Sequence, residues 1–252
     1  MWLDGGVDAW GLVEWVFVIS TILMLPLIIY SVYVSFRVHS TFNRFKQVQV
    51  RGNLTGAQLA QQLLMENSVD CRVEKGHGHL SDHYDPRSKT VVLSPEVYHG
   101  TDVAAYGVAA HEVGHAIQDA TGYLPLKLRQ IIVKSTGLIN RFLMPIIIIG
   151  LFAQFFVFFD SPIFIWFIAA LVVFYGLSFL VTLITLPTEY NASARAREML
   201  RQSNLMDEPE LRGASKVLNA AALTYVAAMA VSLVFFLRNL TLLLMILARS
   251  RR

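Results

Sequence analysis

The residues best suited to chemistry lie in the stretch HEVGH, where His111 and His115 stand four positions apart and Glu112 follows the first histidine. One helical turn separates such positions, so both imidazoles leave the same face of a helix and can bind one zinc ion without distortion. Glu112 points about 100° around the helix, which is too far for easy ligation but within reach of a water on the metal. Its carboxylate could take the proton of that water and pass it to the leaving amine. The pattern is typical of zinc peptidases.

The residues around this motif are small, as in VAAYGVAAHEVGHAIQ. Two histidines on an exposed helix would satisfy the same spacing, but small neighbours favour a helix buried beneath an active-site cleft. Gly114 would let another element approach this face closely. We expect the helix to run from about Thr101 to Thr121 and to end at Gly122.

A zinc peptidase needs a third protein ligand and an open fourth position. In the stretch LPTEYNASARAREML, we expect Pro187 to begin a helix after an apolar run, which places Glu189 in its first turn. Glu189 is therefore the candidate third ligand, and a role limited to capping the helix is the weaker alternative. The rival ligands stand in loop or strand contexts without paired spacing: His77, His79, His83 and His99.

The composition indicates a membrane protein, because 55% of the residues are hydrophobic and 15% are charged. Soluble proteins have roughly 45–50% apolar and about 25% charged residues. About 20 apolar residues cross a bilayer as a helix, and four uncharged runs approach or exceed this length: Trp15–Phe36, Phe142–Phe159, Ile163–Leu186 and Val217–Leu237. The single cysteine, Cys71, rules out a disulfide within the chain.

The basic residues predict the orientation in the membrane. Residues 37–141 and 187–216 hold 17 of the 21 Lys and Arg residues, whereas residues 1–15 hold none. By the positive-inside tendency, we expect both basic segments in the cytoplasm, and the N-terminus and the turn at Asp160–Pro162 outside. The chain lacks a basic patch interleaved with aromatic residues, so orientation and anionic lipid explain its basic flanks better than nucleic acid does.

The water-facing part should be mostly helical, with a little sheet. Thr55 and Gln58 form a possible capping box, and the helix after them has an apolar stripe made by Leu59, Leu63 and Leu64. Short strands are expected at Cys71–Glu74 and Thr90–Ser94. The predicted fold class is a mainly α, polytopic membrane protein, with a cytoplasmic zincin-like unit joined to three to five transmembrane helices.

We expect five segments along the chain. They are an N-terminal segment with the first transmembrane helix (1–36), a cytoplasmic metallopeptidase unit (37–141), a transmembrane hairpin (142–186), a cytoplasmic helix with the third ligand (187–216) and a hydrophobic C-terminal region with a basic tail (217–252). The last region stays open, because Val217–Ala248 is too long for one ordinary span and too short for two. Arg238 could mark a turn inside it or extend its charge from one end of a span.

The order of four stretches resembles the YugP-type bacterial membrane zinc metallopeptidases: LSDHYDPRSKTVVLSPEVYHG, VAAHEVGHAIQDATGY, LPTEYNASARA and AALTYVAA. At greater distance the chain is similar to the HtpX and CAAX prenyl-protease gluzincins. The resemblance implies zinc as cofactor, Glu189 as third ligand and a site that faces the cytoplasm. Ser193 stands where the distant group has an aspartate that orients a ligand histidine, so Ser193 or Asn191 would take that role here.

Gluzincins bind their peptide substrates along the edge of a strand beside the zinc helix. The resemblance therefore suggests that Val91, Val92 and Leu93 bind substrate through a free strand edge, unless they only close the small sheet. Expected partners are protein or peptide substrates, including membrane proteins, and the lipid bilayer. An oligomer or a regulatory membrane partner is compatible with the sequence.

Other functions are weaker readings of the same residues. An inactive zinc-stabilised scaffold or adaptor would not need Glu112. An intramembrane zinc protease would carry HExxH on a spanning helix, but the apolar stretch before the motif is short, and Asp102 and Asp119 bracket the helix. A transporter or channel usually needs charged residues within its spans, and the first three apolar runs contain no Asp, Glu, Lys or Arg.

Overall fold

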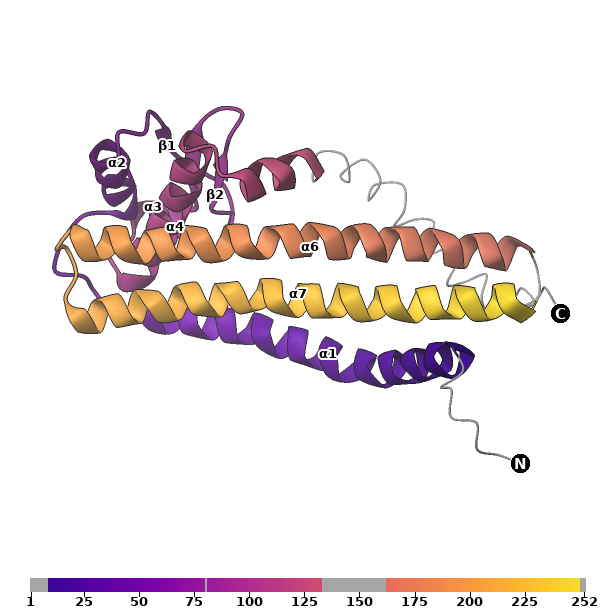
Figure 1. The fold of residues 1–252 in the computed structure, drawn as a ribbon. Coiled ribbons are helices and arrows are strands. Elements are labelled where there is room, and N and C mark those ends of the chain that lie inside the picture. The colour runs from indigo at the N-terminus through magenta and orange to yellow at the C-terminus, as the bar shows by residue number, and fades with distance from the viewer. Residues whose placement is uncertain (1–8, 80, 133–161, 250–252) are drawn as a thin grey trace. The chain divides into compact units, whose positions relative to one another are not determined.

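The computed structural model describes residues 9–79, 81–132 and 162–249 of the chain (Figure 1). The described elements are α1 (Ala9–Phe45), α2 (Gly56–Glu66), β1 (Arg72–Lys75), β2 (His83–Asp85), β3 (Thr90–Leu93), α3 (Pro95–His99), α4 (Val103–Ala120), α6 (Pro162–Gln202) and α7 (Glu208–Arg249). Residues 124–132 are helical as well. The predicted apolar run Phe142–Phe159 lies outside the described residues.

Three helices are long and apolar enough to cross a membrane. α1 has 37 residues, α6 has 41 and α7 has 42, roughly twice the 20 or so residues that a bilayer requires. They are the candidate membrane spans within the described part of the chain. The predicted class of a mainly helical membrane protein with a small sheet is therefore confirmed.

Pro187 does not begin a helix, so that prediction was wrong. α6 runs without a break from Pro162 to Gln202, and Pro187 lies inside it. A proline removes one backbone N–H, but a long helix tolerates this loss where its neighbours are packed and bonded. Thr188 donates a side-chain hydrogen bond to the Ile184 carbonyl at 3.1 Å. Glu189 is consequently a mid-helix residue and not a first-turn residue.

α7 resolves the open question about the C-terminal region. It is one continuous helix from Glu208 to Arg249, so Arg238 does not mark a turn. The Arg238 guanidinium lies over the ring of Phe17 in α1, 5.6 Å from its centroid. This geometry is a cation–π contact.

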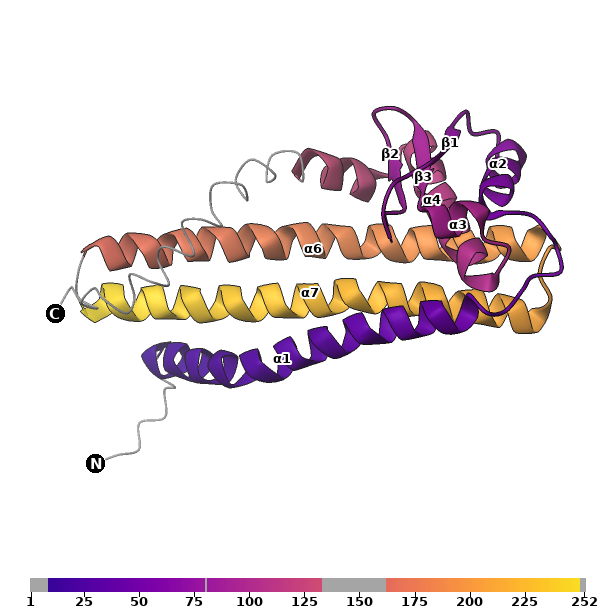
Figure 2. The ribbon, with the colours of Figure 1, turned by 180° about the vertical axis from the view of Figure 1, so that it is seen from behind.

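The chain divides into two compact units. The helical unit contains the described residues up to Val32, residues 130–132 and 162–183, and residues from Ala227 onward. Within it α6 and α7 lie side by side (Figures 1 and 2), where Thr182 and Ser232 share a hydrogen bond of 3.2 Å. The α+β unit contains Tyr33–Arg129 and Ile184–Val226. It thus includes residues 217–226, which the sequence assigned to the hydrophobic C-terminal region.

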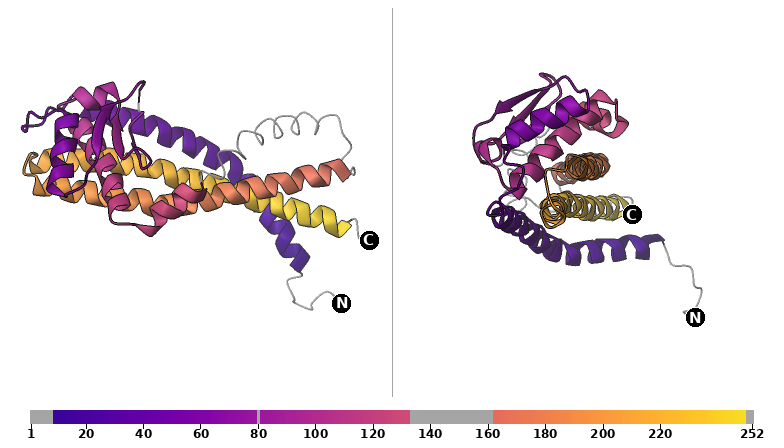
Figure 3. Two further views of the ribbon diagram at one scale, coloured as in Figure 1. Left: turned by 90° about the horizontal axis from the view of Figure 1, so that it is seen from above. Right: turned by 90° about the vertical axis from the view of Figure 1, so that its left-hand side faces the viewer.

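The core of the α+β unit forms where α2 and α4 pack together (Figure 3). Thr55 and Gln58 form the predicted capping box at the start of α2, which satisfies two N–H groups that a helix start leaves free. The predicted stripe of Leu59, Leu63 and Leu64 is buried in this core. The hydrophobic effect therefore holds α2 against the helix that carries HEVGH.

The sheet has the strand order β1-β3-β2, with β1 parallel and β2 antiparallel to β3. The sequence analysis found β1 and β3 but missed β2, which has only three residues. β3 is the central strand, so the free edge expected at Val91, Val92 and Leu93 does not exist. Val91 pairs with Val73 on one side and with Tyr84 on the other, and Val91 and Leu93 are fully buried. The basis for assigning substrate to this strand is therefore lost.

α4 has the boundaries that its end residues predict. The Asp102 side chain accepts a hydrogen bond from the Ala105 N–H at 2.9 Å and caps the helix start. Gly122 follows the last turn with a φ of +68°, a left-handed conformation that glycine adopts without strain. At Gly114 a Cβ atom would lie 2.7 Å from the Ala192 carbonyl oxygen. Glycine is therefore required there, because α6 approaches α4 so closely.

Candidate metal centre and active site

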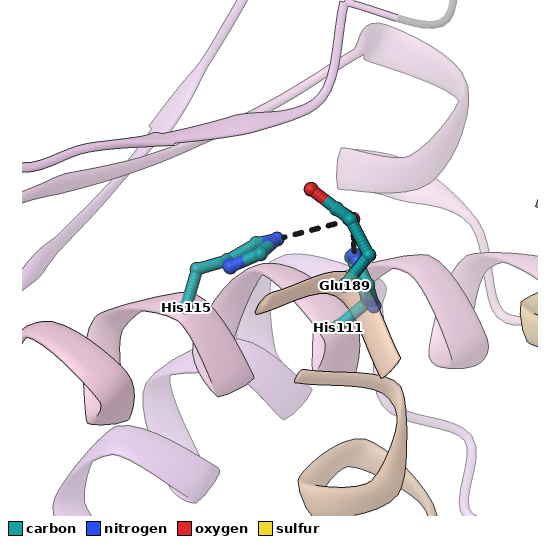
Figure 4. A group of neighbouring side chains, drawn as sticks. All are labelled: His111, His115 and Glu189. Atoms are coloured by element: carbon teal, nitrogen blue, oxygen red, sulfur yellow. Dashed lines mark hydrogen bonds and ion pairs between the residues drawn. The ribbon is translucent and has the colours of Figure 1, made fainter. Parts of the chain in front are cut away.

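Two helices bring three side chains of metal-ligand type together in the α+β unit. His111 and His115 come from α4 and Glu189 comes from α6 (Figure 4). One ligand atom from each lies within 4.8 Å of the others, and this is the one such group among the described residues. The structure therefore brings the third ligand predicted from the sequence to the histidine pair.

The distances fit the coordination geometry of zinc. Glu189 Oε2 lies 3.1 Å from His111 Nε2 and 3.6 Å from His115 Nε2. In a tetrahedral site with bonds of roughly 2.1 Å, two ligand atoms stand roughly 3.4 Å apart. Two imidazoles and one carboxylate are also the ligand set of many catalytic zinc sites, in which a fourth position stays open.

Gln118 determines which nitrogen of His115 is free for a metal. The Gln118 Nε2 donates to the Thr188 carbonyl at 2.8 Å and to Asn191 Oδ1 at 3.0 Å. Because both partners are acceptors, the amide oxygen must face His115 Nδ1, 3.0 Å away. His115 therefore carries its proton on Nδ1 and presents the lone pair of Nε2 to Glu189 and the metal position.

Asn191 is held in turn by Arg195. The Arg195 Nε donates to Asn191 Oδ1 at 2.9 Å, and an arginine can only donate. Arg195, Asn191, Gln118 and His115 thus form one chain of hydrogen bonds. Asn191 was expected to orient a ligand histidine, and in this network of hydrogen bonds it is linked to His115 through Gln118.

Ser193 is placed beside the other ligand histidine. Its Oγ lies 3.2 Å from His111 Nδ1, and both Ser193 and Glu189 are nearly inaccessible to solvent. A hydroxyl can accept the Nδ1 proton, which would leave His111 Nε2 free on the side of Glu189. Ser193 is therefore placed where it can orient His111, as the sequence analysis expected of Ser193 or Asn191.

Arg129, which the sequence analysis missed, supplies a positive charge next to Glu189. It lies in the helical residues 124–132, and its Nη1 is 2.7 Å from Glu189 Oε1. The two carboxylate oxygens of Glu189 thus have separate partners, the guanidinium on one side and the histidines on the other. A buried carboxylate without a counter-charge would be costly, and Arg129 supplies that charge.

Glu112 faces a cavity next to the three ligand-type residues. The cavity has a volume of about 170 Å³, and His111, Glu112 and Glu189 all line it. Burial raises the pKa of Glu112, and the neighbouring His111 and His115 oppose this rise. A carboxylate with a raised pKa binds a proton more readily, which suits a general base.

Tyr225 is a further residue of this site that the sequence analysis did not assign. It belongs to the quoted stretch AALTYVAA in α7 and lines the same cavity. Glu189, His111 and Glu112 line this cavity as well. The only sequence signal for it was the presence of a tyrosine among small residues.

The rival histidines have partners elsewhere. His79 Nε2 lies 3.1 Å from Glu96, and His83 Nδ1 lies 2.7 Å from the Ser81 carbonyl. Within the described residues, neither these two nor His77 and His99 join the group of three ligand-type side chains. The structure therefore favours Glu189 over them as third ligand.

Comparison with known proteins identifies the family of the chain. The chain matches the family described as "putative neutral zinc metallopeptidase" over residues 20–244. It is 36% identical over 225 residues to a Bacillus subtilis (strain 168) protein named "Putative membrane protease YugP", covering 88% of this chain and 94% of that protein. No solved structure matches the chain. The chain therefore belongs to the family of neutral zinc metallopeptidases, and Zn²⁺ is the cofactor that His111, His115 and Glu189 are suited to bind.

Proposed function

We propose that this protein is a membrane zinc metalloendopeptidase that hydrolyses peptide bonds at the HEVGH site, on the cytoplasmic side of the membrane. The proposal rests above all on one arrangement: His111, His115 and Glu189 converge within 4.8 Å of one another, and Glu112 lines the cavity beside them. The family match and the related membrane protease support the same chemistry.

His111 and His115 would bind the zinc ion through Nε2, and Glu189 would bind it through Oε2. When bound, the ion would supply a Lewis acid that activates water and polarises the scissile carbonyl. Glu112 accepts the proton of the attacking water and returns it to the leaving amine. Burial prepares Glu112 for this role, because a raised pKa makes its carboxylate a better proton acceptor.

The residues around the ligands prepare the site for binding. Gln118 holds the proton of His115 on Nδ1, and Ser193 lies at the same atom of His111. Arg129 binds the Glu189 oxygen that faces away from the histidines. Each ligand would thus be held in position before the metal arrives, which lowers the entropic cost of binding.

The orientation rests on charge. The α+β unit includes most of the two basic segments, residues 37–129 and 187–216, and the positive-inside tendency predicts that such segments stay in the cytoplasm. We therefore propose that substrates are cytoplasmic proteins or the cytoplasmic parts of membrane proteins.

Activity of the full chain in detergent tests the function. We expect about one zinc per chain, cleavage of casein that stops with a chelator, and recovery when zinc is added back. Glu112→Gln should keep the metal and lower kcat by roughly 10²–10⁴-fold, because the proton transfers need the carboxylate. The control is Glu66→Gln on the surface of α2. Normal turnover by Glu112→Gln would refute the mechanism, and loss of its zinc would refute the role of Glu112.

A further inference from the structure

The cavity beside the candidate metal centre has one apolar wall. Three helices form this wall with the side chains of Val38 and Phe42 from α1, Val108 from α4, and Leu218, Ala221 and Ala222 from α7. The same cavity is lined by Glu112, His111 and Glu189. An apolar group placed in this cavity would therefore be next to the groups that perform the chemistry.

The charged residues of the cavity are all acidic. Asp82 lines it together with Glu112 and Glu189, and no Lys or Arg is among its described lining residues. Asp82 is held by two hydrogen bonds from Ser94, one from the backbone N–H at 2.7 Å and one from the hydroxyl at 3.0 Å. A substrate carboxylate in the cavity would lose its hydration without gaining a lysine or arginine partner from these lining residues.

Two of the residues that line the cavity are alanines. Ala221 and Ala222 of α7 leave space where larger residues would extend into the cavity. The volume of about 170 Å³ accommodates a large side chain and not a folded segment. Small-molecule and peptide sites are commonly apolar cavities with a few convergent polar groups, and this cavity has that composition.

We propose that this cavity binds the side chain of a substrate residue next to the scissile bond, and that this residue is large and apolar, such as Leu, Phe or Met. The inference rests on the proposed peptidase function and adds its substrate class. Acidic residues are rejected at this position. One methylene in such a pocket changes kcat/KM by about 10–200-fold, so the preference over a small residue should be measurable.

The first experiment compares internally quenched peptides with the zinc-loaded full chain in detergent. All peptides share one polar sequence and contain Phe, Leu, Ala, Ser or Asp at a single position. We expect cleavage beside Phe or Leu with a kcat/KM at least about 10-fold above that of the Ala peptide, and almost none beside Asp. Cleavage at equal rates beside all five residues would overturn the inference while leaving the peptidase function intact.

The second experiment fills the cavity. Ala221→Leu should reduce the ratio of kcat/KM for Phe over Ala peptides by about 10-fold or more, because the wall moves inward. Ala228→Leu is the matched control, since Ala228 lies on the same helix two turns further on and is exposed. The control should leave the ratio unchanged. The assignment of this cavity would be contradicted if the ratio changed equally in both variants, or if it changed in neither.

A binding measurement separates failure of this inference from failure of the proposed function. The zinc-loaded Glu112→Gln protein is titrated with the same peptides, and their affinities are read from fluorescence anisotropy. We expect Phe and Leu peptides to bind more tightly than Asp peptides, and we expect the added Ala221→Leu substitution to weaken their binding. This result would support the assignment of the cavity even if the wild-type protein cleaved no peptide. Equal binding of all peptides would overturn the inference on its own.

Discussion

Gln118 and His115 are joined by a hydrogen bond of 3.0 Å between the glutamine Oε1 and the histidine Nδ1. The glutamine cannot rotate its amide, because its Nε2 donates to two acceptors on α6. One side chain on the zinc helix thus determines the tautomer of a ligand three residues earlier. The two hydrogen bonds from Gln118 Nε2 also tie α4 to α6, the two helices that supply the three candidate ligands.

Replacing Gln118 should weaken zinc binding. In Gln118→Ala, His115 loses the acceptor that holds its Nδ1 proton, and we expect zinc affinity to fall by about 10–100-fold. Competition with a fluorescent zinc chelator measures this affinity. The control is Gln61→Ala, an exposed glutamine on α2. Equal affinities of the Gln118 and Gln61 variants would show that His115 does not depend on this hydrogen bond.

Two substitutions of Ser193 should have opposite effects on zinc affinity. Ser193→Ala removes the hydroxyl 3.2 Å from His111 Nδ1 and should lower zinc affinity by about 10-fold. Ser193→Asp should restore wild-type affinity or exceed it, because a carboxylate accepts the Nδ1 proton more strongly. Ser203→Ala, directly after the end of α6, serves as control. Weaker binding in the aspartate variant than in the alanine variant would contradict this role of Ser193.

Glu189 should be essential for the metal. Glu189→Ala removes one of three protein ligands, so zinc content after dialysis should fall well below one per chain. Elemental analysis of the purified protein measures it, and the surface variant Glu198→Ala provides the comparison. If Glu189→Ala kept full zinc and normal activity, one of the loop histidines would have to be the third ligand.

Arg129 should stabilise the zinc-free protein more than the zinc-loaded protein. The guanidinium is the counter-charge of the buried Glu189, 2.7 Å away, and a zinc ion would supply a second one. Arg129→Met should therefore lower the Tm of the zinc-free protein more than that of the zinc-loaded protein. Arg201→Met, on an exposed part of α6, should affect both forms equally. A larger loss in the zinc-loaded form would refute this explanation.

The orientation can be tested by cysteine labelling of intact cells. In a Cys71→Ser background, cysteines at Lys89 and Arg201 should resist a reagent that cannot cross the membrane, because both lie in basic segments. Cysteines at Asp4 and Asp160, which lie outside the described residues, should react. Lysis before labelling should expose all four positions. The opposite pattern in intact cells would place the site outside the cell.

Several features could be predicted from the sequence because they depend on local order. The spacing of His111 and His115 puts both on one helix face, Asp102 and Gly122 mark the ends of that helix, and Leu59 repeats at helical spacing with its apolar neighbours. The length of the apolar runs likewise indicated the long helices. Neighbours in sequence alone decide these properties.

Prediction of secondary structure from the local sequence failed where tertiary packing outweighs the intrinsic preference of the residues. Pro187 is a strong signal for a helix start, but contacts of the residues after it with α4 keep α6 continuous. The short β2 has almost no sequence signal, yet it occupies the second edge of β3 and removes the expected substrate edge. In both cases the deciding contacts come from segments distant in the chain.

The surroundings of the candidate metal centre depended on the tertiary structure entirely. Arg129 and Glu189 are 60 positions apart, and Gln118 and Asn191 are 73 apart. Hydrogen bonds and ion pairs act over about 3 Å, so their partners are chosen by the way α4, α6 and the helix at 124–132 pack. Sequence spacing could identify the residues that bind the metal, but only the fold decided which residues hold them in place.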